Sequence, residues 1–414
     1  MKIEVVTVGT ELVLGLTLDT NAADLGRALA AAGAEIVRHV SVPDRPADIR
    51  AAVAEALDRT GFVIVTGGLG PTRDDMTKLE VAALFGKPLR LDADVLKSLE
   101  ARFRRLGRPM PAVNRTQAEV PEGATVLPNP RGTAPGLWIE DSRGRVAVLL
   151  PGVPSEMRGL LVEAVLPRVA QRVGGGRVVR SHTLRTTGVP ESALAERIGA
   201  VEDDIAPLTL AYIPSVAGVD LRLTAWSLPP AEAEQQLTVH AAALRTRLED
   251  HCYGENDADL AAVVLDLLRG KRLAVGESCT GGLIAGRITA VPGASDVFVG
   301  GVVAYANGVK TDLLDVPAAI LETHGAVSEE AVRAMAQGVQ RRFAADASVA
   351  VTGIAGPGGG TPEKPVGTVW LAARLGAATR AVKRVFPGDR GEIRGRAAQA
   401  ALDLLRRLCL EAPR

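Results

Sequence analysis

The stretch FVIVTGGLGPTRDD, residues 62–75, decides the fold of the first part of the chain. Its opening residues are apolar and mostly β-branched, which predicts a buried strand. A loop rich in glycine and proline follows, and a segment with the apolar spacing of a helix comes next. Units of this kind recur on both sides, and alternating strands and helices predict an α/β domain with a mostly parallel sheet.

The same alternation continues outward from this stretch, from residue 1 to residue 173, until three glycines at 174–176 predict a hinge. The expected strands are 3–8, 35–42, 62–65 and 146–150, and the expected helices are 22–32, 47–57, 78–85 and 93–106. We therefore expect a first domain over residues 1–173.

The rest of the chain predicts two further domains. Residues 174–254 follow the order strand, helix, strand, strand, helix and are closed by the stretch 253–256, which predicts a small α+β domain. Residues 255–414 return to the α/β pattern, with strands expected at 272–275, 297–304, 348–351, 367–373 and 379–386 and helices at 260–269, 281–289, 328–343 and 391–409. The expected fold class is α/β: two three-layer αβα domains with mostly parallel sheets, joined by a small α+β domain.

Size and composition agree with several globular domains. One hydrophobic core rarely grows past roughly 250–300 residues, and the chain has 414. Aromatic residues make up only 3%, so the cores must be built from Ala, Val and Leu, which suits buried parallel sheets. Basic and acidic side chains number 48 each, which argues against a nucleic-acid surface over the chain as a whole.

Cysteine usage and the first residues predict the compartment. Three cysteines cannot form a complete disulfide set, so we expect a reduced, cytoplasmic setting. The start of the sequence predicts a strand and a glycine loop, not a signal peptide. No apolar run reaches the roughly 18–20 residues that cross a bilayer, so we expect no membrane partner.

Loops rich in glycine, proline and acidic residues follow three expected strands of the first domain. They contain GTEL (9–12) with DTN (19–21), GGLGPTRDD (67–75), and PGVPSE (151–156). Glycines at a strand end let the backbone approach a phosphate, and the helix N-terminus that follows favours an anion. Two adjacent carboxylates would repel that phosphate unless a divalent cation lay between them. The alternative is a set of tight turns in which Asp caps the next helix.

These motifs resemble the molybdopterin-binding domain of MoaB and MogA type, and more closely the form of that domain in CinA-family proteins. The resemblance implies an ADP-ribose pyrophosphatase that uses Mg, Mn or Co as a divalent cation and forms AMP and ribose 5-phosphate. The implied metal ligands are Glu11, Asp19, Asp74, Asp75 and Glu156. The implied substrate-binding residues are Thr10, Asn21, Gly67, Gly68, Gly70, Pro71, Thr72 and Gly152.

The strand ends of the third domain carry a different set of side chains. The loops are GESCTGG (276–282), YANGVK (305–310) and TGIAGPGGG (352–360), which offer Ser, Cys, Tyr, Lys and Thr but no paired acids. Such a set suits a nucleophile with a base, and hydroxyls and amides before a helix predict an anion or oxyanion site. Only one of the five histidines, His324, lies in this domain, which argues against a Ser-His-Asp triad.

The residues leave the roles within this set open. Ser278 is the first candidate for the nucleophile, although it also suits a helix cap. Cys279 is the other candidate, because a helix N-terminus lowers a thiol pKa, although a small buried cysteine is the plainer interpretation. Lys310 or Tyr305 would be the base, since a desolvated lysine is neutral near pH 7.

These three motifs resemble the C-terminal domain of the CinA family and its nicotinamide mononucleotide (NMN) deamidases of PncC type. The resemblance implies hydrolysis of NMN to nicotinate mononucleotide and ammonia without a cofactor, and it covers essentially the whole chain, including a KH-like middle domain. It implies Ser278 as the nucleophile and Tyr305 and Lys310 as the proton-transfer groups. The implied binding residues are Cys279, Thr280, Gly281, Thr352, Gly353, Gly356 and Arg394, of which Arg394 also suits a solvated helix face.

Two other functions stay open. One is a regulatory or nucleic-acid-binding protein of DNA uptake, but the middle segment lacks a basic cluster with interleaved aromatics, and its Gly188-Val189-Pro190-Glu191 is not a G-x-x-G clamp. A spacer or dimerisation role suits this segment better. The other is a pterin adenylyltransferase like relatives of the first domain. The expected partners are ADP-ribose, NMN and a second copy of the chain in a homodimer.

Overall fold

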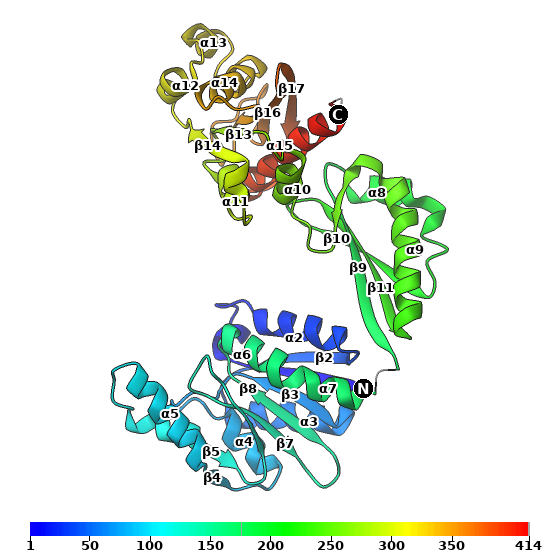
Figure 1. The fold of residues 1–414 in the computed structure, drawn as a ribbon, viewed down its shortest axis with the longest axis vertical. Coiled ribbons are helices and arrows are strands. Elements are labelled where there is room, and N and C mark those ends of the chain that lie inside the picture. The colour runs from blue at the N-terminus through cyan, green and yellow to red at the C-terminus, as the bar shows by residue number, and fades with distance from the viewer. Residues whose placement is uncertain (175, 413–414) are drawn as a thin grey trace. The chain divides into compact units, whose positions relative to one another are not determined.

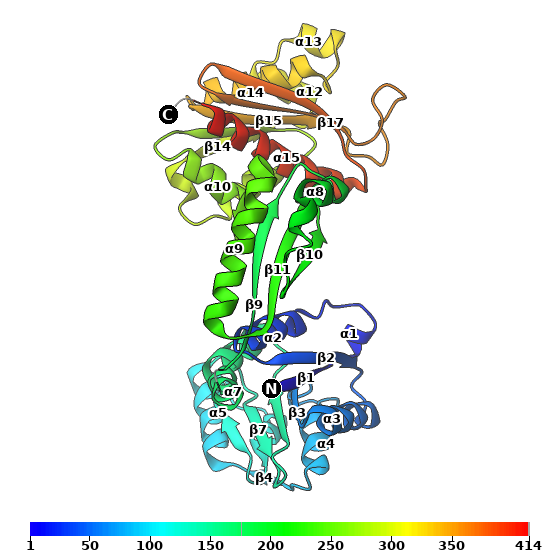
Figure 2. The same ribbon diagram turned by 90° about the vertical axis from the view of Figure 1, so that its right-hand side faces the viewer.

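The computed structural model describes residues 1–174 and 176–412, so Gly175 of the predicted hinge lies outside the described residues. Its contacts divide the chain into two compact units (Figures 1 and 2). The first unit contains Met1–Arg180 and Ala225–Gln236, and the second contains Ser181–Thr224 and Leu237–Arg414. The expected boundaries of three domains stay a prediction.

The first unit contains a six-stranded sheet in the order β2-β1-β3-β8-β7-β6. The strands are β1 (Lys2–Val8), β2 (Glu35–Val42), β3 (Phe62–Thr66), β6 (Thr125–Leu127), β7 (Gly136–Glu140) and β8 (Val146–Leu150). Strands β2, β1, β3 and β8 are parallel, while β7 and β6 are antiparallel to their neighbours. The carboxyl ends of β1, β3 and β8 therefore lie side by side.

Helices cover both faces of this sheet because its strands are apolar on both sides. Ile3 and Val5 point to the face that packs against α2 (Thr20–Ala31), α6 (Pro154–Leu160) and α7 (Leu166–Val173). Val6 and Val8 point to the face that packs against α3 (Pro46–Thr60) and α4 (Thr77–Leu84). Figures 1 and 2 show α7 and α3 on opposite sides of the sheet. The remaining elements are α1 (Thr10–Val13), β4 (Leu89–Leu91), α5 (Ala93–Arg105), a 3-10 helix (Ala112–Ala118), β5 (Glu119–Pro121) and a π-helical turn (Leu161–Val165).

The α+β segment contains one strand more than expected. Its elements are β9 (Val178–Thr186), α8 (Glu191–Ile198), β10 (Leu208–Pro214), β11 (Val219–Leu228), α9 (Pro230–Leu248) and β12 (Cys252–Glu255). The sheet order is β10-β11-β9-β12, and β12 pairs antiparallel with β9. The expectation that residues 253–256 only close the domain was wrong, because four residues are too few to show the alternation of a strand.

The sheet of the second unit has the order β14-β13-β15-β16-β17. The strands are β13 (Leu273–Glu277), β14 (Phe298–Val303), β15 (Ala347–Gly353), β16 (Thr368–Leu375) and β17 (Ala378–Val385). Strands β14, β13 and β15 are parallel, whereas β16 and β17 are antiparallel, because no crossover helix follows β15. The three parallel strands end side by side, as in the first sheet.

Helices flank this second sheet on both faces, so the expected fold class is confirmed. One face packs against α10 (Leu260–Leu267), α11 (Leu283–Thr289) and α15 (Arg390–Glu411). The other packs against α12 (Asn307–Leu314) and α14 (Glu329–Arg342), next to α13 (Ala318–Thr323). Figure 1 shows these two groups on opposite sides of the sheet. Within residues 1–174 and 176–412, no helix has the length and hydropathy of a membrane span.

Candidate active sites

The loops after β1, β3 and β8 meet at one edge of the first sheet, as expected. The side-chain amide of Asn21 donates to the hydroxyl of Thr66 at 3.2 Å and to the carbonyl of Gly152 at 2.7 Å. The hydroxyl of Thr66 in turn donates to the carbonyl of Pro151 at 2.9 Å. These bonds tie the start of α2, the end of β3 and the loop before α6 into one mouth.

Gly67 and Gly68 are required by this packing. Gly67 has φ +108°, and a Cβ atom there would lie 2.1 Å from the carbonyl oxygen of Val8. Gly68 has φ +65°, and its Cβ would lie 2.2 Å from the hydroxyl of Thr77. The loop after β3 therefore passes between the end of β1 and the start of α4, where no side chain fits.

Asp75 is used inside its own loop, which agrees with a tight turn, but it does not cap the next helix, because α4 has no side-chain cap. Its Oδ1 accepts the amide of Gly70 at 2.7 Å, and its Oδ2 accepts the amide of Thr72 at 2.8 Å and the Thr72 hydroxyl. Asp74, by contrast, is exposed. Hydrogen bonds within the loop lower the pKa of Asp74, and its carboxylate is open to solvent. Pro71 lies in the same loop, between Gly70 and Thr72.

Two other predicted residues have partners that the sequence did not indicate. The amide and hydroxyl of Thr10 donate to Asp44 at 2.7 Å and 3.0 Å. Glu156 accepts the side-chain amide of Asn129 at 2.6 Å. Both side chains are thus tied to other loops, at Asp44 and at Asn129, whereas Glu11 is exposed on α1.

Asp19 and Asn21 leave two oxygen atoms without partners near this mouth. Asp19 caps α2 through Oδ1, which accepts the amide of Ala22 at 2.9 Å. Its Oδ2 and the Oδ1 of Asn21 are buried and have no hydrogen bond, although His39 Nε2 lies 3.4 Å from the Asp19 oxygen in a poor geometry. Buried unpartnered oxygens are rare because each costs free energy.

The predicted metal ligands do not form a protein-only cage. No group of three or more His, Cys, Asp or Glu side chains in the described ranges is placed to hold a metal ion. The two orphaned oxygens of Asp19 and Asn21 do fit a Mg²⁺-like ion that takes its other ligands from water and a diphosphate. The five predicted metal ligands therefore stay a prediction.

Lys78 and Thr77, at the start of α4, are candidate site residues of the first domain that the sequence analysis missed. Lys78 donates to the carbonyl of Thr116, and burial lowers the pKa of Lys78 to about 8. The Thr77 hydroxyl is buried without a partner. A lysine in the first turn of a helix, where the dipole disfavours a cation, was the available signal.

The second mouth lies at the ends of β14, β13 and β15. The amide of Ser278 donates to Val351 at 2.9 Å, and the amide of Ala304 donates to the carbonyl of Glu277 at 2.7 Å. The loops that start at Ser278, Tyr305 and Ile354 therefore leave one edge of the sheet together. Ser278 is buried in this edge, with 8% of its surface exposed.

Glu277 occupies the N-terminus of α11. Its carboxylate accepts the amides of Gly282 at 3.0 Å, Ile284 at 3.1 Å and Ala285 at 2.9 Å. These three amides are therefore not available to an anion, because a buried carboxylate of the chain already satisfies them, and the expected oxyanion site stays a prediction.

Thr280 and Arg394 lie together beside this turn. The Thr280 side chain is fully buried, and its hydroxyl has no partner among the described residues. Arg394 donates to the carbonyl of Thr280 at 2.8 Å and packs against Gly281, where a Cβ would lie 3.3 Å from its guanidinium. Arg394 thus belongs to the mouth, not to a solvated helix face.

Lys310 is buried, with 1% of its surface exposed. Its Nζ donates to the carbonyls of Ala304 at 2.8 Å and Tyr305 at 3.2 Å. Burial lowers the pKa of Lys310. No Asp or Glu in the described ranges forms an ion pair with it. Burial therefore makes the charged ammonium less favourable here than in water.

Cys279 and Tyr305 differ in burial and in hydrogen-bond partners, and the predicted role of Tyr305 in proton transfer stays a prediction. Burial raises the pKa of the Cys279 thiol to about 12, so its thiolate is disfavoured, which agrees with a small buried residue. The Tyr305 side chain is exposed, and its Oη accepts Arg390 at 2.8 Å. Arg390 also donates to the carbonyl of Gly356 at 2.7 Å.

Thr352 and Gly353 serve mainly the framework at the end of β15. The Thr352 hydroxyl donates to Ala326 at 2.7 Å. A Cβ at Gly353 would lie 2.8 Å from the carbonyl oxygen of Thr368, so glycine lets the neighbouring strand approach. Gly353 has no side chain, and the Thr352 hydroxyl uses its one hydrogen on Ala326, so neither residue offers a side-chain donor to the mouth.

Comparison with known families divides the chain into three matches. Residues 4–171 match the probable molybdopterin binding domain, residues 181–254 match the damage-inducible protein CinA KH domain, and residues 257–409 match the CinA C-terminal domain. A CinA-like protein of Gemmatimonas aurantiaca is 55% identical over 411 residues, which are 98% of this chain and 96% of its own length. A CinA-like protein of Gloeobacter violaceus is 45% identical over 408 residues, with 98% and 96% covered.

Solved structures resemble parts of the chain. The competence/damage inducible protein of Agrobacterium tumefaciens is 43% identical and covers 36% of this chain and 93% of its own, with a TM-score of 0.35. The protein CinA of Thermoplasma acidophilum is 36% identical and covers 41% of this chain and 97% of its own, with a TM-score of 0.38.

Proposed function

Because the chain belongs to the CinA family, we propose that it is a bifunctional hydrolase of pyridine-nucleotide recycling. Its CinA C-terminal domain hydrolyses NMN to nicotinate mononucleotide and ammonia. Its molybdopterin-binding-type domain splits ADP-ribose into AMP and ribose 5-phosphate with a divalent cation. Both substrates are products of NAD breakdown, which gives one chain a reason to carry both activities.

The proposal for the C-terminal domain depends on Lys310 having a neutral amine rather than a charged ammonium. A neutral amine has two hydrogens and one lone pair, and two carbonyl acceptors hold the Lys310 Nζ. A charged ammonium would have a third hydrogen, for which the described residues supply no acceptor. The lone pair of the neutral amine is then available as a general base.

Ser278 is the nucleophile in this proposal. The Lys310 amine accepts the proton of the Ser278 hydroxyl as Oγ bonds to the carboxamide carbon. The C–N bond then breaks, and the Lys310 ammonium returns a proton to the departing nitrogen, which leaves as ammonia. Water attacks the resulting ester by the same route, releases the carboxylate and restores the Ser278 hydroxyl.

The remaining polar groups of the mouth suit binding. The unpartnered hydroxyl of Thr280 is a donor for the developing oxyanion. One guanidinium nitrogen of Arg394 donates to the Thr280 carbonyl. Its other N–H groups can donate to the phosphate of the mononucleotide. The proposed roles of Cys279, Gly281 and Gly356 are to shape the walls of this mouth.

The orphaned oxygens of Asp19 and Asn21 support the proposal for the N-terminal domain. When bound, a divalent cation would neutralise the diphosphate charge and polarise the phosphorus under attack. Asn21 also fixes the Gly152 loop at the strand ends, where the diphosphate would lie. The proposed working form is a cytoplasmic homodimer that acts on small molecules.

Product analysis with the full chain tests both halves. The protein is incubated separately with NMN and with ADP-ribose plus MgCl₂, and products are separated by ion-exchange chromatography. We expect nicotinate mononucleotide with equimolar ammonia from NMN, and AMP with ribose 5-phosphate from ADP-ribose. Transfer of AMP from ATP to a pterin, with neither hydrolysis, would overturn the proposal in favour of an adenylyltransferase.

A further inference from the structure

Helix α15 is hydrogen-bonded to all three loops of the second mouth, the proposed amidase site, through two arginines near its start. Arg390 donates to the Gly356 carbonyl and the Tyr305 hydroxyl, and Arg394 donates to the Thr280 carbonyl. The two arginines are four residues apart and therefore share one face of the helix. Any rotation or shift of the first turns of α15 moves both arginines relative to the loops.

The turn between β10 and β11 packs against α15 directly beside these arginines. A Cβ atom at Gly395 would lie 2.6 Å from Cγ1 of Val216 and 3.8 Å from its Cβ. The valine side chain therefore fits a notch that exists only because residue 395 is glycine. Gly395 immediately follows Arg394, so the contact is one residue away from the grip on the Thr280 loop.

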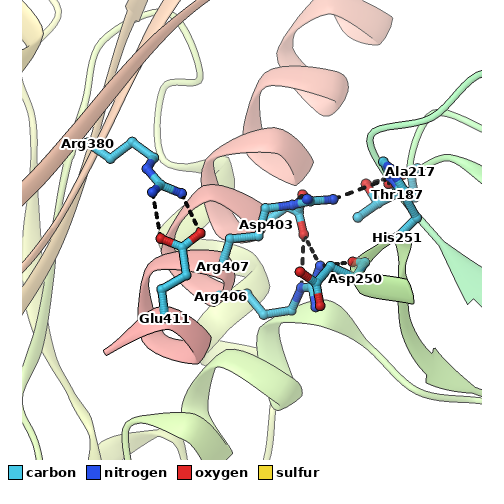
Figure 3. Close-up of polar contacts among 9 residues, drawn as sticks. All are labelled: Thr187, Ala217, Asp250, His251, Arg380, Asp403, Arg406, Arg407 and Glu411. Atoms are coloured by element: carbon cyan, nitrogen blue, oxygen red, sulfur yellow. Dashed lines mark hydrogen bonds and ion pairs between the residues drawn. The ribbon is translucent and has the colours of Figure 1, made fainter. Parts of the chain in front are cut away.

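A polar network at the far end of α15 holds the same turn in place (Figure 3). Asp403 accepts hydrogen bonds from Arg406 at 2.7 Å and from Arg407 at 2.8 Å. Arg406 donates to the carbonyl of Asp250, and Arg407 lies 3.4 Å from His251.

From His251 the network returns to the turn. The Nδ1–H of His251 donates to the Thr187 carbonyl at 3.2 Å, so this nitrogen does not also accept from Arg407. The Thr187 hydroxyl donates to Ala217, next to Val216, at 3.0 Å. Arg380 of β17 pairs with Glu411 and fixes the end of the helix (Figure 3). The KH-like domain therefore contacts α15 at two places, near its start at Gly395 and near its end at Arg406.

We infer that the β10–β11 turn of the KH-like domain is a positioning element of the amidase site. Val216 in the Gly395 notch sets the rotation and height of α15, and α15 in turn sets Arg390 and Arg394 against the three loops. Val216 and Gly395 touch no substrate and act through the arginines. This inference rests on the proposed NMN deamidation, and it gives the KH-like domain a role within its own chain.

Removing methyl groups on one side of this contact and adding one on the other side tests the inference in the full-length protein. Val216→Ala leaves a gap, and Gly395→Ala places a methyl against Val216 while favouring the helix, so neither variant threatens the fold. In the double variant the new Cβ at position 395 lies 3.8 Å from the Cβ that position 216 keeps, which restores the contact. Val239→Ala, on the exposed side of α9, is the matched control.

Each single variant is expected to raise the KM for NMN by about three- to tenfold with kcat nearly unchanged. The double variant should return to within about twofold of the wild type. Hydrogen exchange gives a readout that needs no activity: amides of residues 279–283 and 354–358 should exchange about threefold faster in the single variants and recover in the double variant.

Single variants that match Val239→Ala in both measurements would overturn the inference, as would a double variant without recovery. If the wild type leaves NMN intact, the proposed function fails, and the exchange pattern alone decides the positioning role.

Discussion

The Nζ atom of Lys310 donates to the carbonyl oxygen of Ala304 at 2.8 Å, at the point where β14 ends. A lysine amine in a buried position is costly when charged, and this one is held by backbone carbonyls instead of a carboxylate. The backbone of the same residue, Ala304, also donates to Glu277 in β13. Lys310, the proposed base, is therefore fixed to the strand ends that also carry Ser278, the proposed nucleophile.

Replacing Lys310 by methionine should remove the base and keep the volume. We expect kcat/KM for NMN to fall by about 100-fold or more, with an unchanged circular dichroism spectrum. Lys383→Met is the control, because this lysine is exposed on β17. A Lys310→Met protein with more than a tenth of the wild-type activity would exclude Lys310 as the base.

The pH dependence should report the same amine. Burial lowers the pKa of Lys310 in the folded protein, and only the neutral form accepts a proton. The kcat/KM for NMN should therefore rise with pH and level off, with a midpoint below the ordinary lysine value of 10.5. A profile that is flat, or whose midpoint lies at or above that value, would contradict the assignment.

Glu277 should matter for stability more than any surface acid. Its carboxylate accepts three helix amides, and Gln in its place would turn an NH₂ group toward one or more of them. We expect Glu277→Gln to lower the free energy of unfolding by about 2–3 kcal/mol in urea titrations. The control is Glu329→Gln, a half-exposed acid in the first turn of α14. Equal midpoints for the two variants would show that Glu277 is not a structural cap.

The two activities should respond differently to metal removal. Dialysis against EDTA should abolish ADP-ribose hydrolysis, because the proposed reaction needs a divalent cation to neutralise the diphosphate. NMN deamidation in the same sample should persist, since its proposed groups are side chains of the chain. Loss of both activities on metal removal, with recovery of both on adding Mg²⁺, would contradict a metal-free amidase.

The strand-end loops could be predicted from the sequence because each carries its own signal. Asn21, Thr66 and Gly152 follow three apolar runs, and the rule that parallel strands end at one edge brings them together. The same rule brought Ser278 and Lys310 to one mouth. Helices such as Glu329–Arg342 were predictable from the Ser328 cap and the acidic first turn.

Contacts between distant residues could not be predicted in this way. Arg390 donates a hydrogen bond to Tyr305, which is 85 residues away in the sequence, and no local sequence pattern predicts this contact. Glu277 stands beside Ser278 in the sequence and looked like part of a binding loop, because only the fold turns its carboxylate back onto α11. The strand β12 was missed because its pairing with β9, rather than its own four residues, makes it a strand.

The central claim is that Ser278 attacks a carboxamide, and ammonia release from NMN by the Ser278→Ala protein tests it most directly. Ser295→Ala, an exposed serine of the same domain, is the control. The account predicts a loss of at least about 1,000-fold for Ser278→Ala and wild-type rates for the control. Ammonia release by Ser278→Ala at a rate close to that of the wild type would contradict it.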